Sequence, residues 1–300
     1  EPVKWVEDRR EHFVGTTQER DQYWDAEIAV DGDGKVLGVR GSLIHDHGAY
    51  TARGINLAQN SAVVVTLPYD VPNYHLDVRL ALTNKVSVTP VRGAGHPQGI
   101  FVMERLLDRA ADELGIDRAE IRRRNLVPGD RMPCEKPIKA RNGLPVVLDS
   151  GDYPAAMDMA LKRAGYESFR DRQAAARAEG RYIGMGVANY VKGTGRGPFE
   201  TATVRIGPSG KILVYTGAAA MGQSTKTMMA QIVAEQLKQL RLANCGAQQR
   251  LVVPIEHASP GWPIKTRQLG QAVDQRVFDV LAHSLVVVIL LQTFPACGGR

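Results

Sequence analysis

The chain has 300 residues and 44% of them are hydrophobic, which is enough to bury a sizeable core and to form two domains. Its net charge of +6 is spread along the sequence, so it permits anionic ligands or acidic partner subunits and does not require nucleic acid. The 3 cysteines lie far apart and form no Cys-x-x-Cys pair, so neither an iron–sulfur cluster nor a disulfide framework is expected in this chain.

Residues 1–20 predict the start of a strand and carry a dense group of charges at positions 7–11, which we interpret as a solvated face or as structural ion pairs. Residues 25–44 alternate apolar and polar side chains around a Gly-Asp-Gly turn and predict a β-hairpin. The following His45-Asp46-His47 could form a metal pair. No further ligand cluster stands near it, and we favour a structural role at the end of a strand.

Residues 86–99 are rich in proline and glycine and predict a loop, and Arg92 is the permanently charged group in its middle. Apolar residues at helical spacing follow and predict an amphipathic helix; they are Met103, Leu106, Leu107, Ala110, Ala111 and Leu114. The loop is therefore expected at a helix N-terminus, where backbone amides and the helix dipole favour an anion.

A short helix is predicted over residues 117–125, with Asp117 and Glu120 at capping-box spacing. Its run Arg122-Arg123-Arg124 points in three directions and has no interleaved aromatic residues. We interpret this run as a solvated or subunit-contact face and not as a nucleic-acid patch.

The middle of the chain is predicted to connect two domains. Residues 127–149 are rich in Pro, Gly and Lys and predict a long linker. Two helical stretches follow, over residues 153–165 and 168–180, and are expected to bridge the domains.

A strand is predicted from Tyr182, and a glycine loop follows at residues 192–200. This loop fails as a dinucleotide fingerprint because no helix opens after it. Residues 201–216 then predict a second hairpin around a Gly-Pro-Ser-Gly turn.

The stretch Val214–Leu237 predicts a strand, a Gly-Ala turn and a helix. Ser224 or Thr225 can cap this helix, and Lys226 in its first turn is consistent with a bound anion. Gln223 offers an amide that can both donate and accept, which suits the edge of a heteroaromatic ring. A loop whose small residues merely allow tight packing explains these residues equally well.

Met221-Gly222-Gln223-Ser224 resembles the MGQG pterin-binding loop of the molybdenum-binding subunits of the xanthine dehydrogenase and aldehyde oxidase family. Further motifs of that family occur upstream in the same order. They are Pro2-Val3-Lys4-Trp5, Asp46-His47-Gly48-Ala49-Tyr50, Thr83-Asn84-Lys85, Pro90 to Gly99, Glu104-Arg105 and Ile121 to Leu126. The resemblance covers roughly the first four fifths of the chain. From Arg241 onward it fails, and either a frame-shifted or truncated coding sequence or a diverged helix over Gln271–Leu291 would explain that tail.

The resemblance implies an α+β fold of two mixed α/β domains of the molybdenum-cofactor-binding type, incomplete at both ends. Residues 1–150 would form the C-terminal part of the first domain with its linker. Residues 151–300 would form the N-terminal part of the second domain, with a divergent tail from about residue 241.

The resemblance also implies which residues bind the molybdopterin cofactor. They are Met221, Gly222, Gln223, Ser224, Lys226, Arg92 and Gly93. Arg92 is expected beside the molybdenum. We therefore expect the turns at Arg92 and Gln223 to meet around one cofactor pocket.

Ala94, Phe199 and Glu200 are expected to line the substrate pocket. Purine-oxidising members of the family carry a stacking aromatic residue where this chain has Ala94, and a substrate-orienting arginine where it has Asn60, which argues against xanthine. Relatives that oxidise carbon monoxide place a copper-binding cysteine in the loop that here spans residues 86–99 and contains none. An aldehyde or an N-heteroaromatic compound, oxidised with water as the oxygen source, is the remaining expectation.

In this family a glutamate near the end of the subunit acts as the base, and it is expected to lie outside this chain, so no catalytic base is named. The resemblance further implies an iron–sulfur subunit and an FAD subunit as partners, a small-molecule substrate, an oligomer, and a cofactor with or without a cytosine dinucleotide. No nucleic acid or membrane partner is expected. A cytoplasmic location is the default, because no signal peptide opens the chain and its longest apolar run, residues 285–291, is too short to span a bilayer.

Two other hypotheses remain open at this stage. The chain could be a non-catalytic truncated or frame-shifted fragment without cofactor, which would purify without molybdenum. It could instead be a basic nucleic-acid-binding protein, which would bind any duplex with a steep dependence on salt.

Overall fold

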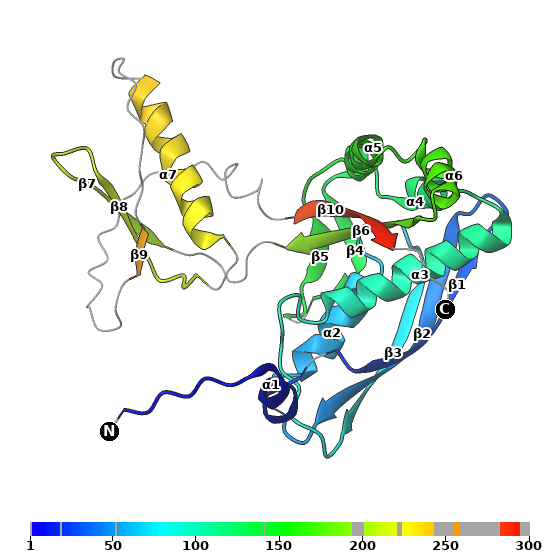
Figure 1. Cartoon of the computed structure of the whole chain (residues 1–300), viewed down its shortest axis with the longest axis horizontal. Coiled ribbons are helices and arrows are strands. Elements are labelled where there is room, and N and C mark those ends of the chain that lie inside the picture. Colours follow the sequence, from blue (N-terminus) through cyan, green and yellow to red (C-terminus); the bar gives the residue numbers. More distant parts are fainter. Residues whose placement is uncertain are drawn as a thin grey trace. The chain divides into compact units, whose positions relative to one another are not determined.

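The computed structural model describes residues 2–18, 20–51, 53–140, 142–193, 201–220, 224–242, 255–257 and 283–294. The chain divides into two compact units, Glu1–Thr194 with Asp274–Arg300 and Gly195–Val273. Both units combine helices with strands, as the predicted α+β class requires (Figure 1). Among the described residues, no helix is long and apolar enough to cross a membrane.

The first unit contains a three-stranded sheet with the strand order β1-β2-β3. Its strands are β1 (Gln22–Val30), β2 (Val36–Gly48) and β3 (Tyr74–Leu82). β1 and β2 are antiparallel and form the predicted hairpin, and the Asp31 carboxylate shapes its turn by accepting hydrogen bonds from the amides of Asp33 and Lys35 at 3.0 and 2.8 Å. β3 runs parallel to β2, because helix α2 (Ile55–Val64) lies in the crossover between them.

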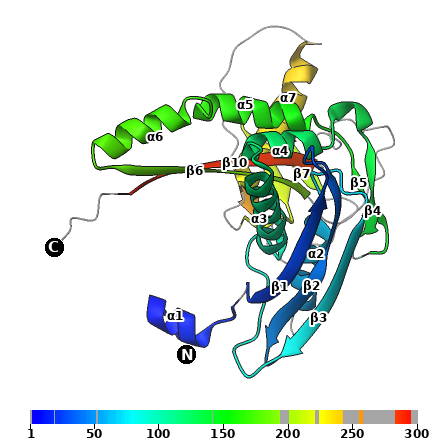
Figure 2. The same cartoon turned by 90° about the vertical axis from the view of Figure 1, so that its right-hand side faces the viewer.

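Helices α2 and α3 pack against one face of this sheet (Figures 1 and 2). α3 (His96–Leu114) is followed by α4 (Arg118–Asn125). The buried residues of α3 follow the predicted helical spacing and are Gly99, Met103, Glu104, Leu107, Ala110 and Ala111. The amphipathic helix is therefore confirmed. It begins at His96, inside the segment predicted as loop, because the sharp turn of the backbone ends at Gly95.

The N-terminal segment differs from its prediction, because it forms helix α1 (Arg9–Gly15) and not a strand. The charges explain the difference. The Asp8 carboxylate accepts the Glu11 amide and the Glu11 carboxylate accepts the Asp8 amide, both at 2.8 Å, which is a capping box. Glu7 and His12 form a further exposed pair at 2.6 Å. The charged group at positions 7–11 thus serves local structure, as interpreted.

Residues 127–149 fold onto the first unit, so the predicted long linker is wrong. Their elements are η1 (Gly129–Arg131), β4 (Cys134–Lys139) and β5 (Pro145–Leu148). β4 and β5 pair antiparallel, and Cys134, Lys136 and Leu148 are buried. The composition was misleading because Lys136 points inward. Its ammonium donates to the carbonyl oxygen of Tyr69 at 2.5 Å, and burial lowers the pKa of Lys136.

Two helices and a strand follow in the first unit, and all three were predicted. These elements are α5 (Tyr153–Ala164), α6 (Phe169–Ala178) and β6 (Tyr182–Gly193). Asp152 caps α5 by accepting the amide of Ala155 at 3.0 Å, and the left-handed Gly165 ends it.

The described part of the C-terminal tail is a strand, β10 (His283–Phe294), which pairs antiparallel with β6. The helix offered for Gln271–Leu291 is therefore wrong where the structure describes it. The run Val-Val-Val-Ile within this segment is β-branched throughout, which favours a strand over a helix.

The second unit combines a short sheet with one helix. Its elements are β7 (Ala202–Ile206), β8 (Ile212–Thr216), α7 (Thr225–Leu242) and β9 (Ile255–His257). β7 and β8 form the second predicted hairpin, and β8 pairs parallel with β9. Ile212, Val214 and Val233 are buried together, with Leu237 packed against them. The predicted strand and helix of residues 214–237 are therefore confirmed, whereas residues 221–223 between them lie outside the described residues.

Arg122 on α4 is fully buried, so the interpretation of the arginine run as a solvated face is wrong at this residue. Its Nε donates to Glu104 Oε2 at 2.7 Å and its Nη2 donates to Asp108 Oδ1 at 2.9 Å, both on α3. The Tyr69 hydroxyl donates to the other oxygen of Glu104 at 2.5 Å. Burial lowers the pKa of Arg122, but the attractions to Glu104, Tyr69 and Asp108 together outweigh it, and the net shift is upward. Burial raises the pKa of the Glu104 carboxyl.

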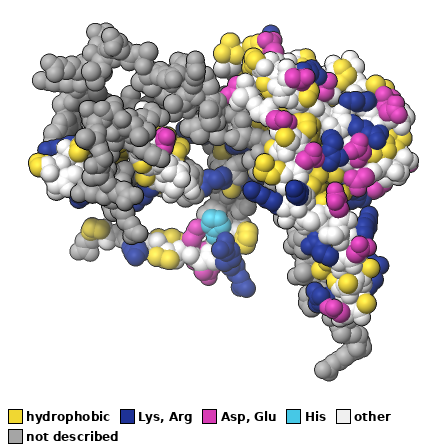
Figure 3. Space-filling model, turned by 90° about the horizontal axis from the view of Figure 1, so that it is seen from above, with side chains coloured by type: hydrophobic (Ala, Val, Ile, Leu, Met, Phe, Trp, Pro, Cys, Tyr) yellow, Lys and Arg dark blue, Asp and Glu magenta, His cyan; other side chains and the backbone are white. Residues whose placement is uncertain are grey.

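Arg123 and Arg124 lie at the surface, as predicted, and are paired with Asp158 at 2.7 Å and with Glu120 at 2.9 Å. Asp117 caps α4 by accepting amides of its first turn, whereas the carboxylate of Glu120 pairs with the two arginines. In Figure 3, basic and acidic side chains are interspersed over the visible face of the first unit. The described arginines of this run therefore do not form a basic patch.

We predict that Arg122→Leu lowers the free energy of unfolding by about 3–5 kcal/mol, because it leaves the buried Glu104 without its cationic partner. Urea unfolding of the chain followed by circular dichroism measures this change. Arg123→Leu is the matched control: it removes a half-exposed pair and should cost less than about 1 kcal/mol. Equal losses in the two variants would contradict the role given to Arg122.

Candidate functional site

The segment before α3 has an unusual backbone. Gly93, Ala94 and Gly95 have φ angles of 110°, 49° and 88°. Glycine adopts this region freely, whereas an alanine adopts it at a cost of about 1–2 kcal/mol. The three residues turn the chain sharply and make Gly95 the N-cap of α3, without a side-chain cap. We name residues 91–95 the Arg92 loop; the structure places it at a helix N-terminus, as predicted.

Helix α2 holds the Arg92 loop through its backbone. The Asn60 side chain donates to the carbonyl oxygen of Ala94 at 2.8 Å, and the Ser61 hydroxyl donates to that of Gly95 at 2.7 Å. A Cβ atom on Gly95 would lie 2.2 Å from the carbonyl oxygen of Leu57, so only glycine fits there. The loop conformation is therefore imposed by contact with α2.

Sequence reasoning missed the two side chains of α2 that hold this loop. It considered Asn60 only as a replacement for a substrate-orienting arginine, and it did not single out Ser61. A signal was present, because Gly95 and Gly99 are four residues apart on one face of α3. A Cβ atom on Gly99 would lie 2.2 Å from the Ser61 carbonyl oxygen. Small residues at that spacing indicate close approach of two helices.

Arg92 itself is exposed, and its carbonyl oxygen accepts a hydrogen bond from the Arg20 guanidinium at 3.2 Å.

Gln98, in the first turn of α3, has a buried side-chain amide, and neither its oxygen nor its nitrogen has a hydrogen-bond partner among the described residues. A buried amide without a hydrogen-bond partner lowers the stability of the folded chain. The Gln98 amide is therefore suited to a bound group that donates and accepts on one edge, as a pterin ring does.

The second predicted cofactor loop lies in the other unit, and Met221, Gly222 and Gln223 are outside the described residues, as are Phe199 and Glu200. Ser224 is exposed and has a φ of 63°. Its carbonyl oxygen accepts a hydrogen bond from the Met228 amide at 2.9 Å, so Ser224 directly precedes the first residue of α7 and accepts a hydrogen bond of its first turn. Lys226 is exposed in the first turn of α7. Because the two loops belong to different units, their meeting around one pocket stays a prediction.

His45 and His47 lie on β2 and are almost completely buried, with their rings 5.7 Å apart in an edge-to-face arrangement. Asp46 between them accepts the Gly48 amide at 3.0 Å and the Thr83 hydroxyl at 2.7 Å. A Cβ atom on Gly54 would lie 2.4 Å from Cε1 of His47, so the His47 ring packs directly on the backbone that leads into α2. These contacts agree with the structural role favoured for the motif.

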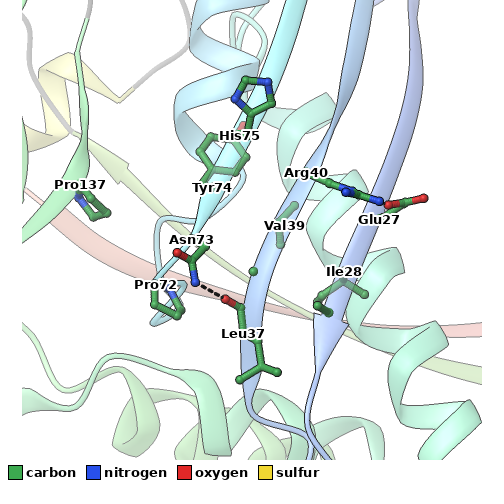
Figure 4. Close-up of a pocket in the computed structure, with 12 residues that line it drawn as sticks. Glu27, Ile28, Leu37, Val39, Arg40, Pro72, Asn73, Tyr74, His75 and Pro137 are labelled. Atoms are coloured by element: carbon green, nitrogen blue, oxygen red, sulfur yellow. Dashed lines mark hydrogen bonds and ion pairs between the residues drawn. The ribbon is translucent and has the colours of Figure 1, made fainter.

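A surface pocket of about 740 Å³ lies at the other end of the sheet, where Asn73 donates to the Leu37 carbonyl oxygen at 2.8 Å (Figure 4). Glu27 and Arg40 point toward each other there and pair at 2.7 Å, with both side chains mostly exposed. None of the residues predicted for cofactor or substrate lines this pocket. We therefore place the candidate site at the Arg92 loop.

Comparison with known proteins shows what the chain is similar to. Two family models, both described as a molybdopterin cofactor-binding domain, match residues 1–126 and 159–249. The gamma subunit of the 6-hydroxypseudooxynicotine dehydrogenase complex of Paenarthrobacter nicotinovorans is 35% identical over 79% of this chain. The carbon monoxide dehydrogenase large chain of Hydrogenophaga pseudoflava is 32% identical, also over 79% of this chain.

The chain belongs to the molybdenum-binding large subunits of the xanthine dehydrogenase and carbon monoxide dehydrogenase type. Its α+β fold is that of the cofactor-binding domains in this family. Among solved structures, quinoline 2-oxidoreductase from Pseudomonas putida 86 superposes with a TM-score of 0.67 and 33% identity, over 84% of this chain and 32% of that one. This chain spans 30 and 31% of the length of the two curated relatives.

We predict that Gly95→Ala destabilises the chain by more than about 2 kcal/mol, because the added methyl group combines an unfavourable φ with a clash against the backbone of α2. Gly115→Ala is the matched control, since Gly115 also has a positive φ but has open space around it. That variant should cost only about 1 kcal/mol. Thermal and urea unfolding of both variants would test the contact, and equal costs would contradict it.

Proposed function

We propose that this chain is the cofactor-binding part of a molybdenum hydroxylase that oxidises an aldehyde or an N-heteroaromatic substrate with water as the oxygen source. The observation that carries the proposal is the Arg92 loop: three consecutive residues with positive φ, held by α2 at the start of α3, within a region that matches a molybdopterin cofactor-binding domain. Such a turn brings backbone and an arginine close to an anionic ligand.

The residues of the chain fit the molybdopterin cofactor. Gly93 has no side chain to keep a ligand away from the backbone, and the buried amide of Gln98 can satisfy both functions of a pterin edge. In the second unit, Lys226 offers a cation at the start of α7. We assign pterin contacts to Met221, Gly222, Gln223 and Ser224 on the resemblance of their motif. When bound, the cofactor supplies the redox centre for the hydroxylation of an electron-poor carbon.

The substrate class is inferred from what the candidate pocket does not contain. Ala94 is small where purine-oxidising relatives have an aromatic residue, and Asn60 is engaged with the loop backbone where they have an arginine. No cysteine occurs in residues 86–99 to bind copper. Phe199 and Glu200 complete the proposed substrate pocket. The names of the reported relatives refer to 6-hydroxypseudooxynicotine and quinoline as well as to carbon monoxide, and the first two are compatible with an N-heteroaromatic substrate.

We further propose an iron–sulfur subunit and an FAD subunit as partners, a molybdopterin cofactor with or without a cytosine dinucleotide, an oligomeric assembly and a cytoplasmic location. The names of the relatives support partner subunits, since they describe a complex subunit gamma and large chains. We propose that residues 1–150 belong to the first cofactor-binding domain and residues 151–300 to the second. The alternative of a cofactor-free fragment is less well supported, because the matches to cofactor-binding domains cover most of the chain.

We predict that Gln223→Ala lowers the molybdenum and pterin content at least roughly tenfold in protein purified from a host that makes the cofactor, because it removes an amide that binds the pterin. The unfolding midpoint should not change. Gln236→Ala, an exposed glutamine of α7, is the matched control and should keep its cofactor. Normal molybdenum content in Gln223→Ala would contradict the assignment, and no molybdenum in the unmodified protein would contradict the proposed function.

Arg92→Ala is expected to lower turnover roughly a hundredfold while cofactor content falls much less, because an arginine beside the metal stabilises charge that develops during the reaction. Turnover per bound molybdenum, assayed on the assembled enzyme with an aromatic aldehyde and with quinoline, separates the two effects. Arg109→Ala, an exposed residue of α3, is the control. A parallel loss of metal and turnover in Arg92→Ala would show a purely structural role.

A further inference from the structure

Gln22 on β1 connects the Arg92 loop with the buried histidines of β2. Its Oε1 accepts the indole N–H of Trp24 at 3.0 Å, and its Nε2 lies 2.9 Å from the Ser61 hydroxyl and 3.3 Å from Nδ1 of His45. The indole N–H can only donate, so it determines which end of the amide is the oxygen. Both amide protons are therefore directed at Ser61 and His45.

The Ser61 hydroxyl has one proton and two carbonyl oxygens within reach, those of Gly95 at 2.7 Å and Leu57 at 2.9 Å. Donation from Gln22 occupies a lone pair of the hydroxyl and strengthens the bond that it donates. The Leu57 carbonyl of its own helix is the common alternative acceptor for a serine within a helix, but the bond to Gly95 is the shorter of the two. Donation from Gln22 thus strengthens the hydrogen bond that holds Gly95.

His45 can accept the second amide proton of Gln22 only when Nδ1 carries no proton. The ring is fully buried, and its Nε2 has no hydrogen-bond partner among the described residues. Burial lowers the pKa of His45, and so do His47 and, more weakly, Lys85, while Asp46 and Asp21 oppose the shift. His45 is therefore neutral at pH 7 and accepts the amide proton.

Protonation of His45 would place an N–H group against the N–H of Gln22. The amide cannot flip to relieve this contact, because its nitrogen would then face the indole N–H of Trp24. The only relief is to move Gln22 away from its partners, and Ser61 then loses the donor that orients it. Protonation of one buried ring on β2 is thereby coupled to the loop in front of α3.

We propose that Gln22 is a positioning residue of the Arg92 loop, which it orders through Ser61 while His45 is neutral. The ordering of the loop follows from the structure alone; its consequence for cofactor binding rests on the proposed function. With His45 neutral, the carbonyl oxygens of Ala94 and Gly95 are held on α2, and Gly93 and Arg92 are presented in one conformation.

Hydrogen exchange of the 300-residue chain tests this proposal without cofactor, with peptides that cover residues 93–100 measured from pH 8 to pH 5. Gln22→Leu should raise exchange there roughly tenfold at pH 8, since an oriented hydrogen bond is lost. Gln173→Leu is the matched control, because Gln173 of α6 donates a hydrogen bond of 2.9 Å to the Ile183 carbonyl oxygen of β6, away from the loop. Unchanged exchange in Gln22→Leu, or the same rise in the control, would overturn the proposal.

The pH dependence has a defined sign. The pKa of His45 is below its ordinary value of 6.5 in the folded chain, so loop order is complete above pH 6.5 and is lost as the pH falls through the lower, folded value. Gln22→Glu should raise the pKa of His45, measured by NMR of the labelled ring, because a carboxylate stabilises the imidazolium. A merely structural glutamine would not cause this shift, and its absence would count against the proposal.

The variant His45→Asn provides a second, independent test if the Gln22→Leu variant does not fold. The asparagine oxygen accepts from Gln22 at every pH, so the loop should stay protected down to pH 5. A pH-dependent loss that persists in His45→Asn would overturn the proposal. If the exchange pattern is as expected while the unmodified chain takes up no molybdenum, the proposed function fails and the positioning role of Gln22 stands.

Discussion

The buried ion pair between Arg122 and Glu104 joins α4 to the middle of α3, and the Tyr69 hydroxyl donates to the same carboxylate. A buried charge that loses its partner costs several kcal/mol, so α3 cannot rotate or slide relative to α4 without a large penalty. Asn189 of β6 lies 3.4 Å from the Tyr69 hydroxyl, and Lys136 of β4 donates to the Tyr69 carbonyl oxygen. One polar cluster thereby fixes the axis of α3, and with it the place where its N-terminus emerges.

The N-terminus of α3 is then shaped by contact with α2. Gly95 and Gly99 allow the two helices to approach so closely that a Cβ atom at either position would meet backbone, and Asn60 and Ser61 bind the carbonyl oxygens of the turn. The strained φ of Ala94 persists because these contacts determine its conformation from both sides. The backbone of the site is thus held in one conformation by its contacts with α2.

The described residues of the two predicted cofactor loops share two features, although the loops belong to different units. The Arg92 loop turns through residues of positive φ into α3, and Ser224, with a φ of 63°, precedes α7. Each loop carries a cation close to a helix N-terminus, at Arg92 and at Lys226. This arrangement favours anionic oxygens in both places, and each loop lies in a segment that matches a molybdopterin cofactor-binding domain.

The sequence by itself determined the elements with a clear period, such as the hairpin over residues 25–44 and α3, and the order of its motifs was specific enough to identify the family. Only the tertiary structure decided which polar side chains are buried. Arg122 and Arg123 are alike in the sequence, and Lys136 lies in a segment with the composition of a linker. Their partners are 18 residues away for Arg122 and 67 for Lys136. A long charged side chain is buried only where folding supplies such a distant partner. Local composition therefore does not predict which of these side chains are buried.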